Sequence, residues 1–173
     1  MEEKIETAIF AGGCFWCTEA VFRKLKGVDE VMPGYANSNK ANPTYGDVFS
    51  GSTGAAEAIQ VKFDPEIISY EKLLEVFFAV HDPTSLNKQG ADEGTQYRSA
   101  VFYHDEEQRN MAEAAKAKIA GAVTEISPLT NFCPAENFHK DYYEKNRTAG
   151  YCRIVIDPKI TKLYKEFGSM VIF

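Results

Sequence analysis

The chain has 173 residues, of which 45% are hydrophobic and 25% are charged, and its formal net charge is −6. This composition predicts a globular protein with one domain, residues 1–173, and enough apolar residues for a substantial core. The acidic balance, without a cluster of lysine and arginine, argues against nucleic acid or an anionic membrane surface as a partner.

The sequence gives no sign of a membrane span or a secretory leader. No apolar run is long enough to cross a bilayer, and residues 1–4 lack a basic lead and an apolar core. We therefore expect a cytoplasmic protein. In that reducing compartment four cysteines indicate catalytic or redox use rather than permanent disulfides.

The first half of the chain mixes strands, helices and polar loops. The patterns predict a strand at residues 5–10, a helix at 14–25, a strand at 28–35, a loop at 36–56 and a strand at 57–63. The clearest helix follows, because one apolar stripe recurs at Tyr70, Leu73, Leu74, Phe77 and Phe78. Asp82-Pro83 ends that helix, and a polar loop extends to Gln96.

The second half continues without regular alternation of strands and helices. We expect a strand at 97–103, a helix at 106–122, a short strand at 123–126, a helix at 134–146, a strand at 153–156 and a short helix after Pro158. This order favours an α+β fold, a single-domain two-layer sandwich with a mostly antiparallel sheet and helices packed against it.

Cys14 follows two glycines at the predicted start of the first helix, and Cys17 lies three residues further on. The free N–H groups at a helix start stabilise a thiolate, so Cys14 is a candidate nucleophile with a lowered pKa. The alternative is a buried cysteine used only for packing, and from these features alone the two are about equally supported. A zinc site fits less well, because Cys133 and Cys152 are far apart and the histidines are scattered.

Two long polar loops are the other candidate functional segments, because long glycine-rich loops within a compact domain are often functional. The first contains Tyr45 and the second contains Asp92 and leads to Tyr97, while Glu57 opens a strand that otherwise has a core pattern. Taken one by one, each of these residues is explained better as a solvated loop residue or a strand-edge charge.

Together, several runs resemble the class A peptide-methionine sulfoxide reductases, which return S-epimer methionine sulfoxide to methionine. The resemblance covers nearly the whole chain and rests on GCFW at 13–16, GYA at 34–36, NPTY at 42–45, SGSTG at 50–54, HDPTSLNKQGAD at 81–92, GTQYRS at 94–99, AENFH at 135–139 and GYC at 150–152.

The resemblance implies roles for the reacting groups. Cys14 matches the family's nucleophile, Glu57 matches the acid that protonates the sulfoxide oxygen, and Tyr45 and Tyr97 match the hydroxyls that hold this oxygen. A sulfoxide is a poor electrophile until its oxygen is protonated or strongly hydrogen-bonded, so a thiolate needs such groups beside it. In an apolar setting Glu57 would have the raised pKa that an acid requires.

The resemblance also implies substrate-binding residues and a resolving thiol. Phe15 and Trp16 match the apolar walls around the substrate methyl group, and Asp92 matches a carboxylate that binds and orients the substrate. Cys152, in the GYC run, matches the resolving cysteine. Cys17 is the alternative, because residues at i and i+3 of a helix lie within disulfide range, and Cys152 is favoured over it.

The implied enzyme passes through a cysteine sulfenic acid, which a second thiol converts to a disulfide. Thioredoxin or a glutaredoxin-like dithiol protein would then reduce that disulfide. We expect protein repair under oxidative stress as the role, a monomer, and no metal or organic cofactor. The chain departs from the family at Cys17, where glycine is common, and it lacks a second cysteine after Cys152. These departures concern the recycling step.

Two other functions compete with this interpretation. A thiol–disulfide oxidoreductase could be built on Cys14 and Cys17, but it has no use for Tyr45, Glu57 and Tyr97 together. A peptide-binding module could hold methionine-containing segments without turnover, but it has no use for two cysteines at a helix start. Reduction of a methionine sulfoxide peptide with dithiothreitol would distinguish the three.

Overall fold

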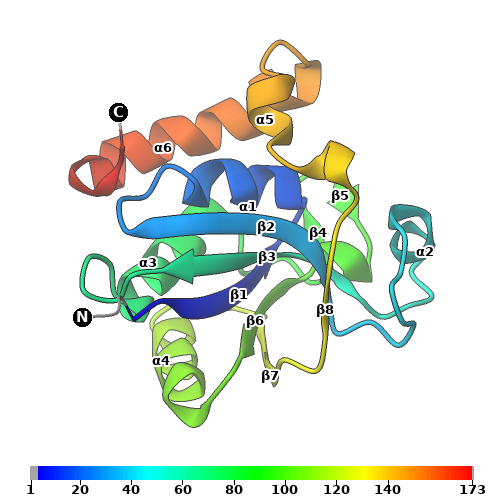
Figure 1. Ribbon diagram of the computed structural model, residues 1–173, viewed down its shortest axis with the longest axis horizontal. Coiled ribbons are helices and arrows are strands. Elements are labelled where there is room, and N and C mark those ends of the chain that lie inside the picture. Colours follow the sequence, from blue (N-terminus) through cyan, green and yellow to red (C-terminus); the bar gives the residue numbers. More distant parts are fainter. Residues whose placement is uncertain (1–3, 173) are drawn as a thin grey trace.

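The computed structural model describes residues 4–172, so residues 1–3, part of the segment without leader features, lie outside it. A six-stranded sheet with the order β7-β6-β1-β3-β2-β8 forms the centre of the molecule (Figure 1). Its strands are β1 (Glu6–Gly12), β2 (Val28–Ala36), β3 (Ala56–Phe63), β6 (Ser99–Tyr103), β7 (Glu125–Pro128) and β8 (Phe132–Pro134). A separate hairpin consists of β4 (Lys88–Gln89) and β5 (Asp92–Glu93).

The sheet is mixed, which corrects the expectation of a mostly antiparallel one, while the α+β class is confirmed. Strands β6 and β7 run parallel, and the other neighbours in the sheet run antiparallel. The reason is the helix α4 (Glu106–Ala117), which returns the chain to the end of the sheet where β6 began. Residues 129–131 alone separate the two edge strands β7 and β8 along the chain, so the sheet curls.

The remaining helices are α1 (Phe15–Phe22), α2 (Tyr45–Phe49), α3 (Tyr70–Val80), α5 (Tyr142–Lys145) and α6 (Asp157–Phe167). Figure 1 shows α1 along β2, with α6 outside α1, and α2 at the opposite end of the molecule from the two termini. The stripe predicted from Tyr70 to Phe78 does form a helix. Its N-cap Ser69 accepts a hydrogen bond from the Lys72 backbone.

The main core lies between the helices and one face of the sheet. The Phe10 ring of β1 packs against Phe22 of α1 and against Tyr70 and Phe77 of α3, with ring centroids 5.1–5.9 Å apart. The other face carries Ile9 and Phe102, but most of its buried side chains are small, which permits the curl. The small residues are Ala11, Ala36, Ala56, Ala58 and Ala100.

Residues 153–156, predicted as a strand, are helical and continue into α6. The run Arg153-Ile154-Val155-Ile156 is rich in β-branched residues, which favour strands. The buried positions, however, are Cys152, Ile156, Ile160 and Leu163, which follow helical spacing. Tertiary packing therefore overrides the local preference here.

The predicted helix at 134–146 is also wrong in extent. The segment begins in β8, continues through the 3₁₀ turn η2 (Asn137–His139), and reaches an α-helix only in α5. Similarly, the strand predicted at 97–103 begins at Ser99, after the 3₁₀ turn η1 (Thr95–Tyr97).

Within residues 4–172, no helix has the length and apolar character needed to span a membrane.

Candidate active site

Cys14 lies where β1 passes into α1. Gly13 has a φ of 90°, a conformation that favours glycine, and Cys14 is the extended N-cap of α1. In the described structure its side chain makes no capping hydrogen bond. Cys14 is 8% exposed, and all four cysteines are free. A reduced and largely buried thiol is therefore held at a helix start.

The pKa of Cys14 lies well above its ordinary value, contrary to the lowered pKa expected from sequence. Burial is the main cause, followed by the hydrogen bond with Cys17 and the negative charge of Glu57. The backbone hydrogen bond at the helix start acts in the opposite direction but is the smaller effect. In the resting protein Cys14 is therefore a neutral thiol.

Cys17 has the lowered pKa instead, at about 7. The hydrogen bond from Cys14 is the main cause, and the positive charge of Lys159 and the contact with the Tyr151 hydroxyl act in the same direction against burial. Of the two hydrogen-bonded thiols, Cys17 is therefore the one that ionises at the lower pH. Cys17 is 3% exposed and its backbone N–H donates to the Cys14 carbonyl.

Glu57, on β3, faces the same helix start. Its side chain is 2% exposed, and its Oε1 accepts a hydrogen bond from the Phe15 backbone N–H at 3.2 Å. Burial raises the pKa of Glu57 to about 8, with smaller contributions from the charges of Asp92 and Cys17. Glu57 is therefore mainly protonated at neutral pH, as the role of an acid requires.

Tyr45, the first residue of α2, and Tyr97, the last of η1, lie close enough to Glu57 for its charge to affect both phenols. The pKa of each is raised, chiefly by burial and then by Glu57. Both phenols are therefore neutral hydrogen-bond donors. The Tyr45 backbone N–H donates to Glu136 Oε2 at 3.1 Å, and Glu136 Oε1 accepts from the Tyr35 hydroxyl at 2.8 Å.

Phe15 and Trp16 belong to an aromatic cluster centred on His139. The His139 ring lies 5.1 Å from Phe15 and 4.8 Å from Tyr45, measured between centroids. Trp16 Nε1 donates to His139 Nδ1 at 3.1 Å, and the indole stacks on Tyr142 at 3.7 Å. This cluster places apolar rings beside Cys14 and keeps them fixed.

Asp92, on β5, is connected to the thiol pair through Tyr151. The Tyr151 hydroxyl donates to Asp92 Oδ2 at 2.8 Å and lies 3.5 Å from Cys17 Sγ. The next residue, Cys152, is fully buried. The structure places Cys17 against Cys14, whereas the resemblance favours Cys152 as the resolving thiol, and the choice between them stays a prediction. Cys133 is half-buried on β8.

The structure adds site residues whose roles the sequence did not indicate. They are Tyr35, Glu136, His139, Tyr142 and Tyr151. All except Tyr142 belong to the runs GYA, AENFH and GYC, but nothing in those runs shows which side chain points inward. Among residues 4–172, no group of three histidine, cysteine or acidic side chains is arranged to hold a metal ion.

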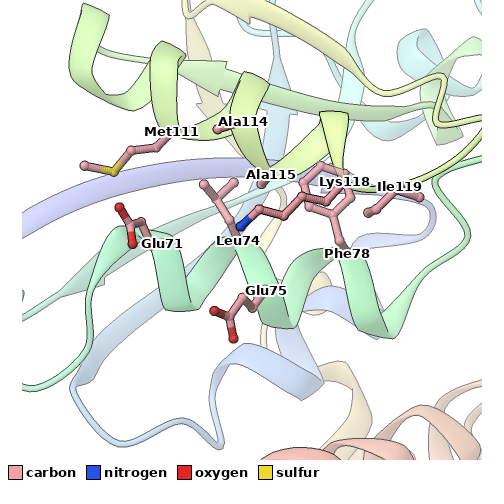
Figure 2. A pocket seen from close by; sticks show the side chains of 9 residues that line it. All are labelled: Glu71, Leu74, Glu75, Phe78, Met111, Ala114, Ala115, Lys118 and Ile119. Carbon is pink, nitrogen blue, oxygen red and sulfur yellow. The ribbon is translucent and has the colours of Figure 1, made fainter.

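A groove elsewhere on the molecule lies between α3 and α4 (Figure 2). Leu74 and Phe78 of α3 face Met111 and Ala115 of α4 across it, and its lining includes Lys118. None of the candidate site residues lines this groove. The candidate site lies instead at the end of the sheet where the turn after β1 and the start of β3 present Cys14 and Glu57.

Comparison with known proteins gives a consistent result. Residues 6–170 match the family model described as peptide methionine sulfoxide reductase. The peptide methionine sulfoxide reductase MsrA of Saccharolobus solfataricus is 49% identical over 172 residues, which cover 96% of this chain and 97% of that protein. Reduced Mxr1 from Saccharomyces cerevisiae superposes with a TM-score of 0.79 at 36% identity, covering 86% of this chain and 90% of that one. Mxr1 in complex with Trx2 gives a TM-score of 0.56 at 28% identity, covering 80% and 85%.

Proposed function

This chain belongs to the peptide methionine sulfoxide reductase family, and on that basis we propose how its own residues carry out the reaction. The protein is an oxidoreductase that uses a thiol to reduce methionine sulfoxide to methionine, and thioredoxin recycles it. The substrate is the S epimer, free or in proteins, and the role is repair of oxidised proteins. The observation that carries the assignment of roles is the placement of the Cys14 thiol beside protonated Glu57, with Tyr45 and Tyr97 as neutral donors.

In the first step the Cys14 sulfur attacks the sulfoxide sulfur. The proton of the Cys14 thiol passes to Cys17, which already accepts its hydrogen bond, and Glu57 gives its proton to the sulfoxide oxygen. The attack joins the two sulfur atoms. The protonated oxygen then moves from the substrate sulfur to the Cys14 sulfur, so that the sulfur–oxygen bond of the substrate and the new sulfur–sulfur bond both break and the oxygen becomes the hydroxyl of a Cys14 sulfenic acid. The substrate sulfur gains two electrons and leaves as methionine, while Cys14 loses two.

Tyr45 and Tyr97 donate hydrogen bonds to the sulfoxide oxygen as negative charge develops on it. Phe15 and Trp16 contact the methyl group, and Asp92 binds the polar part of the methionine residue. Support for this arrangement comes from the rings beside Cys14 and from the Tyr151 hydroxyl, which orients the Asp92 carboxylate.

The sulfenic acid then condenses with Cys17 to give a Cys14–Cys17 disulfide and water. Proximity supports Cys17 for this step, and a Cys-x-x-Cys pair at a helix start is a common redox-active arrangement. Cys152 follows in a second step, in which its thiolate attacks Cys17 and releases Cys14. Tyr151 contacts Cys17 and directly precedes Cys152 in the chain, so a movement of this segment brings Cys152 to the disulfide.

Reduction of the disulfide by a dithiol protein completes the cycle. The solved complex of Mxr1 with Trx2 supports thioredoxin for this part, and a glutaredoxin-like protein is the alternative. We further propose that residues 1–173 act as one domain, as a monomer in the cytoplasm, without a metal or organic cofactor.

Incubation with dithiothreitol and a peptide containing S-epimer methionine sulfoxide tests the proposal. Mass spectrometry should show that the peptide loses one oxygen, and the R-epimer peptide should remain unchanged. The Cys14→Ser protein, which replaces the thiol with a much weaker nucleophile, should show only a trace of this activity. Equal turnover of both epimers, or activity in Cys14→Ser, would contradict the assignment.

A further inference from the structure

Two strongly exposed phenylalanine side chains flank the candidate active site. Phe49, the last residue of α2, is 61% exposed, and Phe138, in η2, is 65% exposed. The Phe49 ring lies 6.1 Å from the Tyr45 ring, and the Phe138 ring lies 4.1 Å from His139. Because Tyr45 and His139 also contact one another, the four rings form a continuous row with an exposed phenylalanine as the last ring at each end.

Both phenylalanines are attached to segments that hold the site together. Gln96, the residue before Tyr97, donates from Nε2 to the Phe49 carbonyl at 3.4 Å. A capping box between Thr44 and Asp47 fixes the short helix that ends at Phe49. Phe138 directly precedes His139 in the chain and follows Glu136 by two residues. Glu136 accepts a hydrogen bond from the Tyr45 backbone N–H. These exposed rings therefore have defined positions relative to Tyr45.

We infer that Phe49 and Phe138 make this enzyme select polypeptide segments in which apolar side chains neighbour the methionine sulfoxide. The inference rests on the proposed function and concerns the substrate class of the same site. A methionine in a folded protein is surrounded mostly by apolar residues, and its sulfoxide disrupts that packing because it is polar. The segments that become accessible are therefore apolar, and they are the ones that exposed aromatic rings bind.

The geometry explains why both rings take part. Successive residues of an extended chain are about 3.3 Å apart, so the residues on either side of a bound sulfoxide are still close to the mouth of the site. The Phe49 ring lies next to Tyr45, and the Phe138 ring is connected to Tyr45 through His139. Residues that neighbour the bound sulfoxide in the chain are therefore within reach of these two rings.

Two pentapeptides test the inference, one with leucine and one with serine on both sides of S-epimer methionine sulfoxide. The measured quantity is the ratio of their kcat/KM values with dithiothreitol as the reductant. In the wild type this ratio should favour leucine by about tenfold, the effect of partly burying two leucine side chains. Phe49→Ser and Phe138→Ser should each reduce the ratio, and the double variant should bring it to about 1.

Ile67→Ser is the matched control, because Ile67 is 64% exposed but lies beside Gly27, at the far end of β2. Its ratio should equal that of the wild type, and Phe49→Leu should keep most of the preference. A wild-type ratio near 1, or an unchanged ratio in the double variant, would overturn the inference. So would a double-variant defect seen with thioredoxin but not with dithiothreitol, since the rings would then bind the reductant. Turnover of free methionine sulfoxide by the wild type tests the proposed function separately.

Discussion

Burial acts on Cys14 and Glu57 in the same direction, because it disfavours the charged form of both. It keeps Cys14 a thiol and Glu57 a carboxylic acid, with a Glu57 pKa of about 8. A protonated acid beside a neutral thiol suits a reaction in which the oxygen must be protonated as the sulfur attacks. Cys17, with its pKa of about 7, supplies the place to which the thiol proton can move.

Glu57→Gln should slow the first step by about 10² to 10⁴, the usual contribution of a positioned acid. In the wild type this step should become slower as the pH rises through 8, because Glu57 then loses the proton that it donates. The glutamine variant should lack this alkaline decrease. Single-turnover kinetics from pH 6 to 10 measure both effects, and a variant rate within a few-fold of wild type would assign the proton to another group.

The hydroxyls of Tyr45 and Tyr97 should stabilise the developing oxygen charge together. Each Tyr→Phe change removes one donor and should reduce kcat by about 10- to 10³-fold, and the double change should reduce it further. Tyr103→Phe is a suitable control, since Tyr103 ends β6 outside the site. If both single variants and the double variant kept wild-type kcat, the two tyrosines would be structural aromatics only.

At the scale of elements, the turn from β1 into α1 sets the position of Cys14. Gly13 combines a φ of 90° with very close packing, because an added Cβ would lie 2.7 Å from Cγ of Gln89. Gly13→Ala should therefore lower the free energy of unfolding and also kcat, since the helix start must shift.

Gly51→Ala is the matched control for Gly13→Ala. Gly51 has a similar φ of 79°, but an added Cβ there meets nothing within 4 Å. The Gly51→Ala variant should lose only about 1 kcal/mol in free energy of unfolding, the cost of the backbone conformation. Its kcat should equal that of the wild type. Urea unfolding and steady-state kinetics of the two variants make the comparison, and equal kcat values would show that Gly13 does not position the thiol.

The sequence predicts the elements of this fold better than their edges. Regular apolar spacing identifies α3 correctly. The resemblance selects Cys14, Glu57, Tyr45 and Tyr97, which the structure brings together from the start of α1, β3, α2 and η1. Residues 153–156 were misassigned because β-branched side chains favour a strand, whereas their burial pattern is set by contacts with distant segments. The parallel pairing of β7 with β6 also depends on distant contacts, so no local pattern indicates it. The raised pKa of Cys14 could not be predicted from the sequence either, because it depends on burial by distant segments.

At the scale of the whole molecule, two carboxyl groups with raised pKa values should each contribute less to stability as the pH rises from about 5 to 8. Glu57 and Glu19 have pKa values of about 8 and 7, well above the usual value near 4.3 for an unfolded chain. At these two groups the folded state therefore binds more protons than the unfolded state, and their contribution to stability decreases as the protons are lost. His81 and His139, whose pKa values burial lowers, act in the opposite direction at the acidic end of this range.

Glu57→Gln should remove its share of this dependence. Urea unfolding should be measured for both proteins at pH 5, 6.5 and 8. The free energy of unfolding of the variant should increase relative to that of the wild type as the pH rises, by an amount on the order of a few kcal/mol at pH 8. Parallel stability curves for the two proteins would contradict a raised Glu57 pKa.

Recycling involves distant parts of the molecule, because Cys152 lies at the start of the C-terminal helical segment and is fully buried, whereas Cys14 and Cys17 share the first turn of α1. After one equivalent of substrate, with no reductant present, the proposed order predicts that peptide mapping finds first a Cys14–Cys17 bond and later a Cys17–Cys152 bond. In Cys17→Ser the Cys14 sulfenic acid should persist long enough to be trapped by dimedone, because Cys152 must move before it can reach Cys14. Cys152→Ser should still form the Cys14–Cys17 bond at the wild-type rate and should lose less thioredoxin-dependent turnover than Cys17→Ser. A Cys14–Cys152 bond that forms first, with Cys17 free, would instead support the order that the GYC run indicates from sequence.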